Sequence, residues 1–121
     1  MSRKSDLVNV SGRLGENIVE LHKWLTNDKK EYVMSKQILR SATSVGANIS
    51  EAFYAVSKAE FISKMQISLK EVNETIYWIR ILKKNQLFDE QFKSITNDCY
   101  SIKRMLSKSL QTAKSEDGED S

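Results

Sequence analysis

Apolar residues recur every three or four positions through four successive stretches of the chain, and this spacing strongly limits the possible folds. Such steps place side chains on one face of an α-helix. The first two series are Leu7, Leu14, Ile18, Leu21 and Leu25, then Met34, Ile38, Ala42, Val45, Ile49, Ala52 and Val56. The last two are Ile62, Met65, Leu69, Val72, Ile76 and Ile79, then Phe88, Phe92, Ile95, Cys99, Ile102 and Leu106. Each helix therefore has one face to bury, which predicts an all-α protein.

Short polar segments separate the four series. "TNDKKE" follows the first, with Asn27 as a candidate C-terminal cap, and "KKNQL" follows the third. Ser57 and Glu60 form a Ser-x-x-Glu capping box, which marks the start of the third helix. The chain also contains no Pro, the residue that most strongly breaks helices. Because short connections place consecutive helices side by side, we predict an antiparallel up-down-up-down four-helix bundle.

Charge divides the chain into two parts. Residues 115–121 hold four acidic residues and no basic one, whereas the whole chain carries a net charge of +3. The bundle is therefore basic and the end of the chain is acidic. We predict a single four-helix-bundle domain over residues 1–114 and an acidic, disordered tail over residues 115–121.

Cysteine content and hydropathy indicate the cellular compartment in which the protein resides. A single Cys cannot form an internal disulfide, as suits a reducing cytoplasm. No apolar run approaches the roughly 20 residues that cross a bilayer, and the N-terminus lacks the pattern of a secretory signal. We expect a cytoplasmic protein with no membrane contact.

The stretch "RSATSVGANISEA", residues 40–52, consists largely of small residues. A phosphate-binding loop would need further glycines and a following Lys, but Gly46 stands alone and the helical spacing of apolar residues continues across it. The stretch therefore predicts a thin helix interior against which a neighbouring helix packs closely. Because a polar side chain beside a core requires partners, we predict a structural hydrogen-bond network of Asn48, Glu51, Ser68 and Glu71.

Catalytic and metal-binding patterns are sparse. A di-metal carboxylate centre in a helical bundle needs Glu-x-x-His motifs, but His22 is the only histidine, and Glu71 and Glu74 have none beside them. Cys99 falls within a core series, which is no setting for a nucleophile. We expect a protein that is not an enzyme and that holds no metal and no cofactor.

The third predicted helix carries apolar residues away from its core face. These are Ile67, Trp78 and Ile81, interleaved with Glu74. A helix that is apolar on two sides requires a second partner. We interpret these four residues as a homo-oligomer interface; the alternative is that Trp78 only widens the core stripe.

Cationic side chains line the outer sides of two predicted helices. On the fourth helix the spacing groups Lys93, Tyr100, Arg104 and Lys108, and on the second helix Lys36 and Arg40 lie one turn apart. Cations meet phosphates and an aromatic ring stacks on bases. These six residues are candidates for binding RNA or DNA; the alternative is an ordinary solvated helix face.

Several of these motifs together resemble a known bacterial family. The segments "SKQILRSATSVGANISEA" and "SKAEFISKMQISLKEVNETIYWIRIL", with the pattern around Asp98, Cys99 and Tyr100, are similar to four-helix-bundle proteins encoded in intervening sequences of 23S ribosomal RNA genes. Such proteins are often labelled S23 ribosomal proteins. The resemblance extends over residues 7–113.

The resemblance implies a homopentameric ring or barrel. It also implies a distant relation to the accessory variability protein of diversity-generating retroelements, a basic pentamer that binds nucleic acid and associates with a reverse transcriptase. We therefore expect a non-enzymatic scaffold that binds RNA or DNA weakly. The alternative is an adaptor ring that recruits a protein partner such as a nucleic-acid polymerase.

Overall fold

Four long helices account for almost all of the structure. The computed structural model describes the backbone of residues 3–120 and the side chains of residues 4–115. The elements are α1 (Arg3–Asn27), α2 (Met34–Phe53), α3 (Lys58–Lys84), the 3-10 turn η1 (Glu90–Phe92) and α4 (Lys93–Asp120). No strand occurs in the backbone over residues 3–120. The all-α prediction is confirmed.

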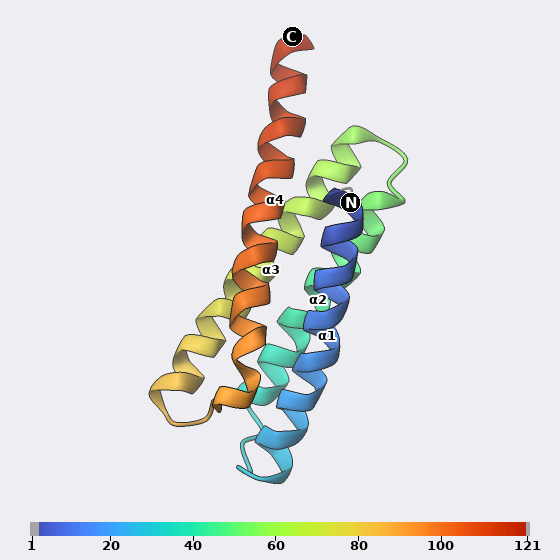
Figure 1. Cartoon of the computed structure of the whole chain (residues 1–121). Coiled ribbons are helices and arrows are strands. Elements are labelled where there is room, and N and C mark those ends of the chain that lie inside the picture. The colour runs from blue at the N-terminus through green and yellow to red at the C-terminus, as the bar shows by residue number, and fades with distance from the viewer. Residues whose placement is uncertain (1–2, 121) are drawn as a thin grey trace.

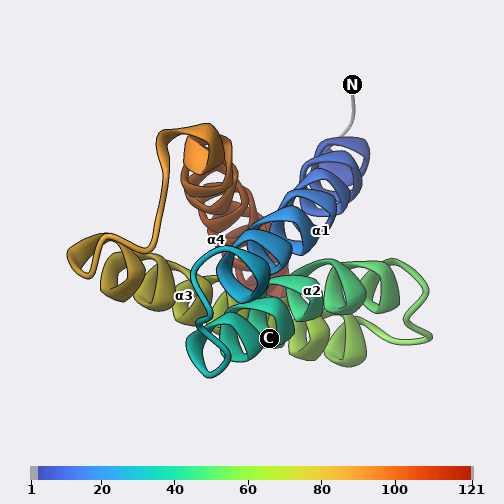
Figure 2. The ribbon, with the colours of Figure 1, turned by 90° about the horizontal axis from the view of Figure 1, so that it is seen from below.

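The helices are arranged around a shared core. α1 packs against α2 and α4, and α3 packs against the same two helices. Figure 2 shows α1 and α4 on one side and α2 and α3 on the other. In Figure 1 the α1–α2 and α3–α4 connections lie at one end of the molecule and the α2–α3 connection lies at the other.

The core forms where the predicted apolar faces meet. All five apolar residues of the first series are fully buried, as are the four members of the last series from Ile95 to Leu106. Val56 is an exception to the second series because α2 ends at Phe53, which leaves its side chain 94% exposed. Phe88 precedes α4 and packs on Phe92, with ring centroids 6.2 Å apart.

The helix ends use caps that the sequence predicts only in part. The Ser57 hydroxyl accepts a hydrogen bond from the Glu60 amide at 3.1 Å, which confirms the start of α3. After α1, however, the residue with a left-handed backbone is Lys30 (φ 56°) rather than Asn27. Gln86 (φ 57°) has the same role after α3, where its amide donates to the carbonyl of Lys83.

The predicted boundary between the bundle and the acidic tail, at residue 114, falls within α4. α4 continues as a helix beyond residue 114 to Asp120, and Ser121 lies outside the described residues. Figure 1 shows α4 projecting past the other three helices at its C-terminal end. A helix already formed by the core face of α4 extends by one backbone hydrogen bond for each added residue, without a new nucleation step.

The small residues of α2 do allow a close approach, as predicted. A Cβ placed on Gly46 would lie 3.5 Å from both the carbonyl oxygen and Oγ of Ser11 in α1. That distance is ordinary van der Waals contact, so the space accepts one methyl group. Gly12, by contrast, faces open space.

These contacts predict opposite effects of small and large substitutions at Gly46. Gly46→Ala should raise the free energy of unfolding by up to about 1 kcal/mol, because Ala favours the helix and its methyl group fits. Gly46→Leu should lower it by about 1–3 kcal/mol through overpacking against Ser11. Urea denaturation measures both, with Gly12→Leu as the control that should be tolerated. Equal effects of Leu at the two positions would contradict the close packing.

Candidate nucleic-acid interface

A charged hydrogen-bond pair fixes the rotation of α4 against α1. Asp98 of α4 directly precedes the core residue Cys99, and only 7% of its side chain is exposed, against 58% for Arg13 in α1. Arg13 Nε donates to Asp98 Oδ2 at 2.9 Å, and Nη2 donates to Oδ1 at 2.7 Å. This paired geometry is the strongest form of a guanidinium–carboxylate contact. This pair was not predicted from the sequence. The feature that could have indicated it is an acidic residue, Asp98, directly before the core residue Cys99.

The rotation of α4 places Tyr100 on the outside. Two residues after Asp98, at about 100° per residue, the helix has turned roughly 200° away from α1. Tyr100 is 41% exposed. It begins an open groove of about 540 Å³ along the outer face, termed the α4 groove, whose lining residues are Tyr100, Lys103, Arg104, Ser107, Lys108 and Gln111. The groove brings together the predicted Tyr100, Arg104 and Lys108, and adds Lys103.

A second hollow lies between α3 and α4. This α3–α4 crevice has a volume of about 80 Å³, and its lining residues are Ile76, Ile79, Arg80, Lys83, Thr96 and Tyr100. Tyr100 therefore belongs to both hollows. Arg80 and Lys83 were not predicted as site residues, because residue spacing along a single helix does not show which stripe of α3 faces α4.

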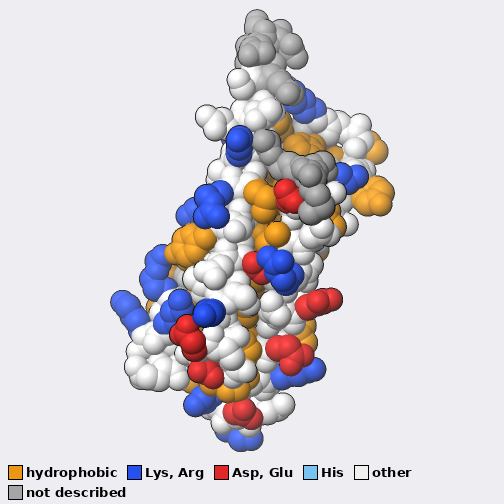
Figure 3. Space-filling view, in the orientation of Figure 1, with side chains coloured by type: hydrophobic (Ala, Val, Ile, Leu, Met, Phe, Trp, Pro, Cys, Tyr) orange, Lys and Arg blue, Asp and Glu red, His pale blue; other side chains and the backbone are white. Residues whose placement is uncertain are grey.

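The two hollows form one surface of positive charge, termed the α3–α4 basic surface. Its cations are Arg80, Lys83, Lys103, Arg104 and Lys108. No acidic residue lines either hollow. Across residues 4–115, none of these five cations forms an ion pair. In Figure 3 the Lys and Arg side chains gather along the left side of the view, over α3 and α4.

The remaining predicted cations lie elsewhere or are already engaged. Arg40 Nη1 donates to Glu71 Oε2 at 2.7 Å, and its Nη2 donates to Glu74. The hydrogen bond with Glu71 raises the pKa of Arg40. Arg40, a predicted nucleic-acid-binding candidate, thus joins α2 to α3 with its guanidinium engaged by two carboxylates. Lys36 is exposed but lines neither hollow, and Lys93 Nζ lies 3.9 Å from Glu90 Oε1.

The four predicted interface residues on α3 do not form one exposed apolar face. Trp78 packs against the core of its own bundle, which favours the alternative of a widened core stripe. Ile81 is half-buried, and Glu74 is bonded to Arg40. Only Ile67 combines an apolar side chain with substantial exposure, at 39%.

The predicted polar network is divided into separate contacts. Asn48 Nδ2 donates to the Ser44 carbonyl at 2.8 Å, within its own helix. Ser68 Oγ donates to the Val45 carbonyl at 2.8 Å, across to α2. Glu51 pairs instead with Lys64, at 3.5 Å, and Glu71 with Arg40. Backbone carbonyls accept hydrogen bonds from the amide and the hydroxyl, and cations pair with the two carboxylates, so each of the four residues has a partner outside the set.

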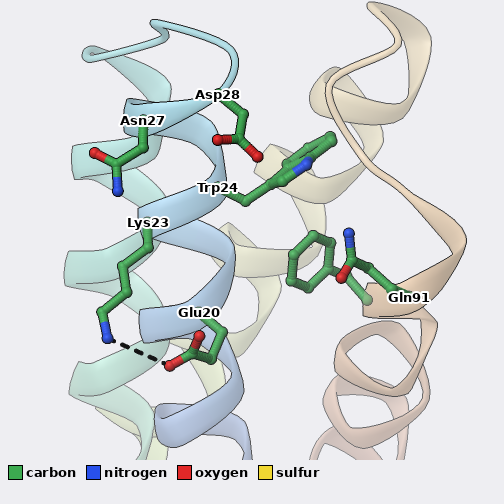
Figure 4. A pocket seen from close by; sticks show the side chains of 7 residues that line it. Glu20, Lys23, Trp24, Asn27, Asp28 and Gln91 are labelled. Atoms are coloured by element: carbon green, nitrogen blue, oxygen red, sulfur yellow. Dashed lines mark hydrogen bonds and ion pairs between the residues drawn. The ribbon is translucent and has the colours of Figure 1, made fainter.

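Other side chains that could take part in chemistry lie apart from one another. Burial raises the pKa of the Cys99 thiol to about 12, with a smaller contribution from Asp98. A further groove of about 270 Å³ lies where α1 ends beside η1, and Figure 4 shows Lys23 paired with Glu20 along it. Among the described residues, no three His, Cys, Asp or Glu side chains gather where they could hold a metal ion. None of the described helices is long and apolar enough to span a bilayer.

The chain is similar to a known protein family and to a protein of solved structure. The family described as 23S rRNA-intervening sequence protein matches residues 3–108. The chain is also similar to a protein of unknown function from the S23 ribosomal protein family of Bacteroides thetaiotaomicron VPI-5482, whose crystal structure was solved at 1.70 Å. The two are 44% identical with a TM-score of 0.87, over 91% of this chain and 99% of the other. No curated protein matches the chain. The family resemblance predicted from the motifs is confirmed.

Loss of Arg13 should destabilise the protein more than loss of an exposed cation. Arg13→Met leaves the buried Asp98 carboxylate without its partner, which should lower the free energy of unfolding by about 2 kcal/mol; solvent around the half-exposed Arg13 limits the loss. Lys23→Met, which breaks the exposed pair with Glu20, should cost less than about 0.5 kcal/mol. Urea denaturation compares the two.

A second substitution tests the cause of that loss. Adding Asp98→Leu to Arg13→Met should recover most of the stability, because no buried charge then remains unpaired. Equal stabilities of the Arg13→Met and Lys23→Met proteins would contradict the structural role of the pair.

Proposed function

Because the chain belongs to the 23S rRNA-intervening sequence protein family, we propose that it is a non-enzymatic, oligomeric scaffold that binds RNA or DNA weakly. The binding surface is the α3–α4 basic surface. The relative with a solved structure is described as having unknown function, so the proposal depends on this chain's own residues. Its protomer is an antiparallel up-down-up-down bundle, and the family resemblance favours a homopentamer.

One observation carries the proposal: five cations line two adjoining hollows and have no acidic partner. Elsewhere in the bundle, Arg13 and Arg40 are bound by carboxylates. Neighbouring cations that have no acidic partners repel one another, so a polyanion would relieve that repulsion as well as bind. Phosphate contacts of this kind do not read sequence, and they weaken as salt concentration rises.

Oligomerisation would offset the modest charge of a single protomer. A net charge of +3 gives each chain only a small overall attraction for a polyanion. Copies of the α3–α4 basic surface held in one assembly would act on the same strand, so that each contact raises the effective concentration of the next.

A second candidate function is an adaptor that recruits a protein partner. It is favoured by an apolar groove of about 420 Å³ between α1 and α2, lined by residues that include Val8, Ile49 and Phe53. Tyr54 lies at its edge and is 84% exposed. Apolar grooves bordered by exposed aromatics are typical of protein-binding sites.

Charge reversal on α4 tests nucleic-acid binding. The double change Arg104→Glu and Lys108→Glu should weaken binding and reduce the slope of log affinity against log salt by about 1.4–1.8, since each phosphate contact contributes about 0.7–0.9. Fluorescence anisotropy with a labelled oligonucleotide at several salt concentrations measures both. The matched control is Lys30→Glu with Lys36→Glu, which changes the net charge equally. Equal losses in both double variants would indicate a nonspecific charge effect and contradict this surface.

Light scattering tests the assembly. We expect a mass several times the 13.9 kDa of one chain at micromolar concentration. Ile67→Glu should lower that mass if the outer side of α3 is an interface. Val19→Glu on α1 is the control, because Val19 and Ile67 are both 39% exposed. A monomeric mass for the unaltered protein would contradict the oligomeric part of the proposal.

A further inference from the structure

The geometry around Tyr100 points to a single-stranded ligand: we propose that a single nucleic-acid strand passes from the α4 groove across Tyr100 into the α3–α4 crevice. One base stacks on the Tyr100 ring, and the phosphate next to it enters the crevice between Arg80 and Lys83. This inference rests on the proposed function and specifies its substrate class.

Tyr100 is the junction of the two hollows. Its side chain lines both, and it is the only aromatic residue that lines either. Lys103 and Arg104 follow it by one turn on α4, while Arg80 and Lys83 approach from α3. A strand that follows the cations from one helix to the other must therefore cross the exposed ring.

Thr96 places an unpartnered polar group in the wall of the crevice. Its Oγ1 is buried and has no hydrogen-bond partner within the protein. Thr96 also lines the crevice, as do the exposed Arg80 and Lys83. A buried hydroxyl without a partner destabilises a protein. Entry of the strand would part the crevice walls enough for a phosphate oxygen held by the two cations to accept a hydrogen bond from Thr96, which would remove that cost.

The aromatic junction distinguishes single strands from duplexes. Base–aromatic stacking requires an unstacked base face, which a single strand offers and a regular duplex does not. A duplex could meet the cations through its phosphates alone. Stacking is tolerant of sequence, as expected for a surface that has no side chains arranged to read base edges.

The first test removes the ring. Probes are fluorescein-labelled 12-nucleotide oligo-dT and oligo-U and a 12-base-pair DNA duplex, each titrated by anisotropy. Tyr100→Leu should weaken binding to both single strands by about tenfold, and should change duplex binding by less than about twofold. Tyr100→Phe should retain single-strand affinity because it keeps the ring. Tyr32→Leu is the control, since Tyr32 is an exposed tyrosine of the α1–α2 connection.

The second test removes the Thr96 hydroxyl. Thr96→Val keeps the shape of the side chain, so it should raise the melting temperature of the free protein while weakening single-strand binding several-fold. A purely structural threonine would not move these two quantities in opposite directions. Thr43→Val is the control: the Thr43 hydroxyl is already satisfied by the Leu39 carbonyl at 2.7 Å, so its loss should not raise the melting temperature or alter binding.

The outcomes separate this inference from the proposed function. If the unaltered protein binds neither single strands nor duplex, the proposed function fails. If it binds with steep salt dependence but Tyr100→Leu leaves single-strand affinity unchanged, or the duplex binds more tightly than either single strand, the basic surface stands and the single-strand inference is overturned. Circular dichroism and thermal melting of each variant confirm that the comparison is made on folded protein.

Discussion

The hydrogen bonds between Arg13 and the buried carboxylate of Asp98 determine which face of α4 meets solvent. Apolar packing alone would permit small rotations of this helix, because aliphatic contacts have no direction. A guanidinium bound through two nitrogens to two carboxylate oxygens does have direction. With Asp98 held toward α1, Tyr100 must point outward. The contact between Asp98 and α1 thus determines which residues of α4 face solvent.

A second ion-pair cluster divides the charges on α3. Arg40 of α2 binds Glu71 and Glu74, so the acidic residues of the middle of α3 face α2 and are neutralised there. Beyond them the charged residues of α3 are all basic, and two of these, Arg80 and Lys83, border α4. Two sets of carboxylates are therefore engaged by arginines on other sides of the bundle. The α3–α4 basic surface keeps its charge because no carboxylate lies along it.

Apolar spacing predicted the four helices and nearly all of the core, because burial of one face is a property of each helix by itself. The same reasoning failed where the answer depended on two helices at once. Arg40 was predicted to be available for nucleic acid, but Glu71 and Glu74 of α3 bind it. Trp78 was predicted to lie at an interface between protomers, but it packs on the core of its own bundle. The α3–α4 crevice could not be predicted, since it exists only when Thr96 and Arg80 are brought together. Val56 was wrongly predicted to lie on the buried face of α2, because no strong stop signal in the sequence marks Phe53 as the end of that helix.

Photo-cross-linking tests the proposed nucleic-acid interface most directly. A 12-nucleotide oligo-U carrying 4-thiouridine would be irradiated with the unaltered protein, digested with trypsin and analysed by mass spectrometry. We expect the cross-link in the peptide of residues 94–103, which contains Thr96 and Tyr100, with loss of that product in Tyr100→Leu. Cross-links confined to peptides of α1 or α2 would contradict a nucleic-acid interface on α3 and α4.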